Sequence, residues 1–188
     1  MIEALVGVAA GTVALILLIA CVEHLLAPRS LPSALAAHAT VPRGLTRPLA
    51  AAVTALEGLL AVGLVTAVAT GAGRGPLTGL LVAAGVLLTA YAAYTHRLLR
   101  ASHGRRVPCG CSRADTPVSG WVVLRAAVPA VLALAAAVRA DAITAPAESA
   151  ARFAEASIAG AVFAVLLWVL PEAMIDPGAA RREGRHGV

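Results

Sequence analysis

The stretch "MIEALVGVAAGTVALILLIACVEHLL", residues 1–26, contains an apolar run over residues 4–22 that lies between Glu3 and Glu23. The hydrocarbon core of a bilayer is about 30 Å thick and a helix rises about 1.5 Å per residue, so a run of this length can span a membrane. A signal peptide would have a positively charged start and a small-residue cleavage site before polar sequence, and this stretch has neither. We therefore predict a retained membrane helix.

The rest of the chain has the same character. Of its 188 residues, 60% are hydrophobic and 13% are charged, and the mean hydropathy is +0.86, which is too apolar for a soluble domain. Four further segments are long and apolar enough to span a membrane, at residues 48–70, 76–95, 118–138 and 153–171. We predict an all-α polytopic membrane bundle over residues 1–175, with four core helices and a fifth, and a disordered polar tail over residues 176–188.

The connector between the first two spans, "APRSLPSALAAHATVPRGLTRP" at residues 27–48, is too long for a tight turn. Its apolar residues recur at helical spacing, at Leu31, Leu35, Ala36 and Ala39. This pattern predicts a short helix lying at the membrane interface.

Arginine supplies all 15 basic residues, against 10 acidic ones, and its distribution predicts the orientation. Eleven arginines fall on one side of a five-helix zigzag: Arg29, Arg43, Arg47, Arg97, Arg100, Arg105, Arg106, Arg113, Arg181, Arg182 and Arg185. Three fall on the other side, namely Arg74, Arg139 and Arg152. The positive-inside bias then places the N-terminus outside a cell membrane and the loop after residue 95 in the cytoplasm. Lipids are the expected surroundings, and no aromatic-interleaved basic patch indicates a nucleic-acid partner.

Two of the three cysteines, Cys109 and Cys111, lie in the stretch "RVPCGCSRADTPVSGWVVLRAAVPA" at residues 106–130. A disulfide between them requires the chain to bend, which Gly110 permits, and so small a ring is strained and readily reduced. Neighbouring arginines and the start of the next helix both favour the thiolate. The motif therefore suits a dithiol that cycles with a disulfide.

Two other interpretations of the cysteines stay open. With His96 or His103 they could ligate Cu(I), Zn(II) or Hg(II) in a soft-metal transport or handling protein. The chain's two methionines and its lack of a CxxC motif argue against this, and we predict no metal site. Alternatively the cysteines are incidental and the protein is a non-enzymatic assembly subunit.

Apart from Glu155 at the start of the fifth span, two charges lie inside predicted spans, Glu57 in the second and Arg125 in the fourth. An intramembrane carboxylate is unfavourable unless it is paired or protonated, so Glu57 is a candidate functional residue with Arg125 as its natural partner. Two interpretations stay open: the two residues form an ion pair that fixes the second span against the fourth, or Glu57 takes part in proton transfer. The aromatic residues Trp121, Trp168, Tyr91 and Tyr94 fall near predicted helix ends, where interface anchoring is expected.

Over about residues 1–138 the chain resembles the MauE family of DoxX-like, redox-associated membrane proteins. The resemblance rests on "PCGCS" followed by "GWVVLRAAVPA", and upstream on "CVEHLLAPRSLPSALAAHATVPRGLTRPLAAAVTALEGLLAVGLV", with its Val-Pro and internal glutamate. It matches Cys109 and Cys111 to the family's cysteines, Glu57 to its helix-two glutamate, and Arg125 to the arginine opening its next helix. The family is associated with methylamine utilisation.

The resemblance implies a thiol–disulfide oxidoreductase that takes part in the maturation of exported proteins, including methylamine dehydrogenase, with a thioredoxin-like partner. A more distant similarity to membrane thiol oxidoreductases of the vitamin K epoxide reductase and DsbB type implies a quinone as electron acceptor. The sequence alone fixes no cofactor.

Overall fold

The computed structural model describes residues 2–38, 40–101, 118–143 and 149–174. Its α-helices are α1 (Ile2–Leu26), α2 (Ser30–His38), α3 (Thr46–Ala69), α4 (Arg74–Ala101), α5 (Gly120–Val138) and α6 (Ala150–Ala173), and short 3-10 helices lie at η1 (Arg43–Leu45) and η2 (Ala140–Ala142). Five helical segments are long and apolar enough to cross a membrane. The predicted all-α polytopic bundle is confirmed.

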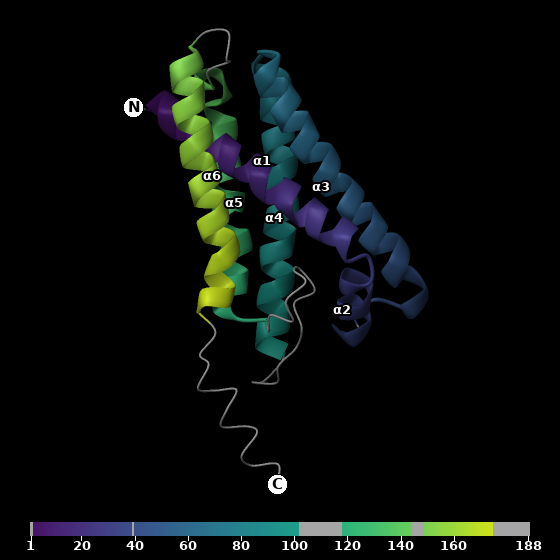
Figure 1. The fold of residues 1–188 in the computed structure, drawn as a ribbon. Coiled ribbons are helices and arrows are strands. Elements are labelled where there is room, and N and C mark those ends of the chain that lie inside the picture. The colour runs from purple at the N-terminus through teal and green to yellow at the C-terminus, as the bar shows by residue number, and fades with distance from the viewer. Residues whose placement is uncertain (1, 39, 102–117, 144–148, 175–188) are drawn as a thin grey trace.

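The long helices form a bundle in which α1 runs obliquely across the others (Figure 1). Helix α4 packs chiefly against α5, while α1 packs against α6, α3 and α5. Aliphatic and alanine side chains fill the core, including Val13, Leu17, Leu64, Leu81 and Ala133. The remaining faces expose large apolar side chains, for example Leu59, Val131 and Ile158, as expected of a bundle surrounded by lipid.

Small residues bring α1 and α6 close together. A Cβ atom placed on Gly160 would lie 3.1 Å from the backbone nitrogen of Thr12 and 3.2 Å from the carbonyl oxygen of Val8. The hydroxyl of Thr12 donates to the Gly160 carbonyl oxygen at 3.3 Å. On α1, a Cβ atom on Gly7 would lie 3.1 Å from that of Ala156. Glycine at these positions therefore sets the separation of the two helices.

Several helices extend beyond their predicted ends. The first span continues to Leu26, so Glu23 and His24 are helical. The third continues to Ala101, and Arg97 and Arg100 are therefore part of α4 rather than of the following loop. In both helices the apolar run on which the prediction was based ends before the helix does. Backbone hydrogen bonding continues the helix through the polar and charged residues that follow the run. The short helix predicted in the connector is α2, and its position at the membrane interface stays a prediction.

Candidate functional site

A cavity of about 470 Å³ lies between α1, α2, α3, α4, α5 and α6. Most of its wall is aliphatic, with Leu17 from α1, Leu35 from α2 and Val53 from α3 among the contributors. It extends from Thr40, in the connector after α2, to Glu57, at the middle of α3. The cavity thus reaches from one end of the bundle to about the middle of a predicted span.

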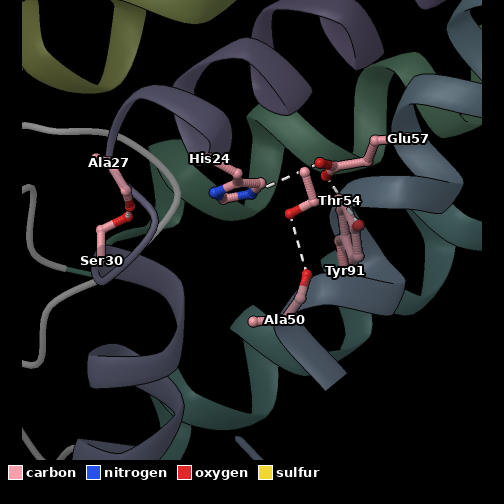
Figure 2. Close-up of polar contacts among 7 residues, drawn as sticks. All are labelled: His24, Ala27, Ser30, Ala50, Thr54, Glu57 and Tyr91. Carbon is pink, nitrogen blue, oxygen red and sulfur yellow. Dashed lines mark hydrogen bonds and ion pairs between the residues drawn. The ribbon is translucent and has the colours of Figure 1, made fainter. Parts of the chain in front are cut away.

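The deepest polar group of the cavity is the Glu57 carboxylate, which is only 1% exposed. The phenol of Tyr91, on α4, donates a hydrogen bond to Glu57 Oε1 at 2.9 Å. The imidazole of His24, on α1, places Nε2 3.7 Å from Glu57 Oε2. Figure 2 shows both rings pointing toward the carboxylate. Helices α1, α3 and α4 therefore each contribute one side chain to a buried polar cluster, which can accept and donate hydrogen bonds.

Arg125, on α5, lines the same cavity as Glu57 and is also buried. Its guanidinium carbon lies 4.6 Å from the ring centroid of Trp168, on α6, a cation–π arrangement that stabilises a cation away from water. The structure thus brings the two predicted intramembrane charges to one cavity. Their direct ion pair stays a prediction.

A second polar group lies at the outer end of the cavity. The hydroxyl of Tyr94, on α4, is 2.8 Å from Nδ1 of His38 and 3.0 Å from the hydroxyl of Thr40. These contacts hold the end of α2 and Thr40 against α4. Tyr91, Tyr94 and Trp168 line the cavity, and their predicted role as interface anchors stays a prediction.

The predicted redox residues Cys109, Gly110 and Cys111 lie outside the described residues, and so does the polar tail predicted over residues 176–188. The described chain stops at Ala101, where α4 ends, and resumes just before α5 begins at Gly120. The C-terminal part of α4 and the N-terminal part of α5 both line the cavity, through Tyr94, Thr95 and Val122. The helices on either side of the segment that carries both cysteines therefore both line the cavity.

The third cysteine, Cys21, is buried on α1. Its sulfur lies 3.1 Å from where a Cβ atom on Gly58 would be. Cys21 therefore acts as a small packing residue between α1 and α3.

Sequence reasoning missed His24 and Tyr91 as neighbours of Glu57. For His24 a signal was present, because Leu17, Cys21 and His24 recur at helical spacing and all three are buried. Extending that face one turn beyond the apolar run would have placed the imidazole inside the bundle. Tyr91 offered no comparable signal, since a tyrosine near the end of an apolar run is equally typical of an interface anchor.

Comparison with known proteins gives one match. Residues 2–139 match the family model described as methylamine utilisation protein MauE. No curated protein and no solved structure matches. The matched range covers α1 to α5, whereas α6, which supplies Trp168 to the cavity, lies beyond it.

Proposed function

Because this chain belongs to the MauE family of methylamine utilisation proteins, we propose that it is a multi-pass membrane thiol–disulfide oxidoreductase. Cys109 and Cys111 form its redox pair. They exchange with a thioredoxin-like partner, or with a quinone, in the maturation of exported proteins. Glu57 and Arg125 support the reaction from the membrane interior.

One observation carries this proposal. The two helices that flank the segment with the Cys-Gly-Cys motif, α4 and α5, both contribute residues to the cavity that contains Glu57. This supports a dithiol that meets a protein partner at this end of the bundle and acts together with the cavity. Burying Glu57, His24 and Arg125 together also costs desolvation free energy, and such intramembrane clusters mark functional sites.

The proposed exchange needs no further reagent. One thiolate attacks a sulfur atom of the partner's disulfide, forming a mixed disulfide and releasing the partner's other sulfur as a thiolate. The second cysteine then attacks the mixed disulfide. The cysteine pair is oxidised to a disulfide as the partner's disulfide is reduced to a dithiol, and the same steps run in reverse.

The test is to trap the mixed disulfide in cells that express Cys109→Ser, Cys111→Ser or the double variant. We expect one single variant to accumulate a mixed disulfide with a thioredoxin-like protein, and the double variant to accumulate none. Cys21→Ser is the matched control, because this buried thiol should leave trapping unchanged.

Two results would reject the proposal. The first is no trapped partner from either single variant, together with a fully active double variant, as expected of a non-enzymatic assembly subunit. The second is stoichiometric Cu(I) or Hg(II) binding that the double variant loses, with no trapping, as expected of a soft-metal handling protein.

A further inference from the structure

The cavity that contains Glu57 has the size and lining of a small-molecule site. Its volume of about 470 Å³ falls within the range of roughly 300 to 1,000 Å³ typical of ligand pockets. Its apolar wall includes Leu49 on α3, which is 39% exposed, and the exposed Ala90 on α4. Because these residues lie on the outside of the bundle within predicted spans, a ligand can reach the cavity from the lipid.

Aromatic side chains are concentrated in this cavity. The chain has only six Phe, Trp and Tyr residues, yet both tyrosines and Trp168 line it, together with the imidazoles of His24 and His38. Rings distributed around an apolar space favour a flat ligand, which they can contact by offset stacking or edge-to-face packing.

The polar groups of the cavity favour an uncharged ligand that both accepts and donates hydrogen bonds. The Glu57 carboxylate would repel a phosphate or a carboxylate, and the one arginine in the wall, Arg125, is placed over Trp168. Around Glu57, the phenol oxygen of Tyr91, whose proton is donated to the carboxylate, keeps acceptor capacity, and the imidazole of His24 carries an N–H group beside the carboxylate oxygens. A carbonyl or ring hydroxyl suits such a mixed set of donors and acceptors.

We propose that this cavity binds a flat, uncharged, lipid-soluble ring compound with carbonyl or hydroxyl groups, of the quinone class. The ring lies near Glu57, His24 and Tyr91, and its apolar tail lies toward the lipid-exposed residues Leu49 and Ala90. The ligand's role as electron acceptor rests on the proposed function, whereas its binding does not. As acceptor, it would take two electrons and two protons from the dithiol, giving a disulfide and a hydroquinone.

Tryptophan fluorescence tests the binding. In Trp121→Phe, Trp168 becomes the single tryptophan and reports directly on the cavity. We expect decylubiquinone or menadione to quench this fluorescence saturably in the protein reconstituted in lipid nanodiscs. In Trp168→Phe, the remaining Trp121 should be quenched only in proportion to the quinone dissolved in the bilayer.

Two substitutions on α4 provide a matched pair. Ala90→Phe fills the cavity mouth and should weaken saturable quenching about tenfold or more, whereas Ala83→Phe, two turns earlier on an exposed face outside the cavity, should leave it unchanged. Tyr91→Phe should also weaken binding, in protein whose unchanged elution and circular dichroism show that it is folded. Non-saturable quenching of Trp168, or equal quenching in both alanine variants, would overturn the proposal.

The cysteines separate this inference from the proposed function. The Cys109→Ser/Cys111→Ser double variant should bind the quinone with unchanged affinity. Saturable binding without a trapped thiol partner would reject the thiol exchange and retain the quinone site. A trapped thiol partner without saturable quinone binding would retain the thiol exchange and reject the quinone site.

Discussion

At the scale of single residues, the main feature is how a carboxylate is accommodated at the middle of a membrane helix. Glu57 receives a hydrogen bond from Tyr91 and lies beside His24. Such partners offset the desolvation of a buried carboxylate, which is otherwise strongly unfavourable. Thr54, one turn earlier on α3, instead bonds to the carbonyl oxygen of Ala50 in its own helix (Figure 2). The polar cluster is therefore built across helices and not within one.

Tyr91→Phe tests that cluster. Removing the donor to Glu57 should lower the free energy of unfolding by about 1–2 kcal/mol, measured by thermal denaturation in detergent. In a Glu57→Leu background the same substitution should have a much smaller effect, since the acceptor is gone. Thr89→Ala is the control, because within the described part of the chain the Thr89 hydroxyl bonds only to the carbonyl oxygen of Gly85 in its own helix. Equal losses in the two backgrounds would show that Tyr91 acts independently of Glu57.

At the scale of elements, α6 is held to the bundle at several points. Glycines set its close approach to α1, and near the N-terminus of α1 the Arg152 guanidinium pairs with Glu3 at 2.9 Å. That pair is exposed and contributes little to stability. The C-terminal half of α6 brings Trp168 to the cavity. The helix beyond the family match is therefore integrated into the bundle and completes one wall of the candidate site.

Gly160→Leu tests the contact between α1 and α6. The new side chain would meet backbone atoms of α1 that cannot move aside, so the helices must separate at a cost of about 1–3 kcal/mol. The midpoint of thermal unfolding should fall accordingly. Gly79→Leu on α4 is the matched control, because no atom lies within 4 Å of where its Cβ would be. Equal stability of the two variants would contradict the close contact.

At the scale of the whole molecule, most described arginines lie at the end of the bundle that contains α2 and the C-terminal end of α4. Arg29, Arg43, Arg47, Arg97 and Arg100 are at this end, and Arg74, Arg139 and Arg152 are at the other. The antiparallel arrangement of the helices therefore preserves the charge asymmetry read from the chain. The positive-inside rule therefore predicts that the arginine-rich end, where the described chain stops before the cysteine segment and resumes after it, is cytoplasmic.

Labelling with a membrane-impermeant thiol reagent tests that orientation. In Cys21→Ser, we expect Cys109 and Cys111 to react only after cells are permeabilised. For comparison, a variant that lacks the three native cysteines and carries Gly73→Cys has its single thiol at the exposed turn between α3 and α4. This turn lies at the end of the bundle opposite the C-terminal end of α4. The thiol should react in intact cells. The reverse pattern would place the cysteine segment outside, on the side of exported substrates.

The sequence by itself determined the class of the protein. Predominantly apolar runs of sufficient length predicted the five spans, because a helix satisfies its backbone polar groups within one segment even in lipid. The same rule singled out Glu57 and Arg125 as charges inside spans, and local motifs indicated the family. These features depend only on neighbouring residues along the chain.

The tertiary structure alone decided which residues meet. That His24 and Tyr91 face Glu57, that Trp168 reaches Arg125, and that a cavity lies between them followed from packing. In a soluble helix an apolar stripe marks the buried face, but here the helices are apolar on all sides, since one side faces lipid and the other faces neighbouring helices. Periodicity therefore carries little information about orientation, and close contacts between small residues determine which faces pack together.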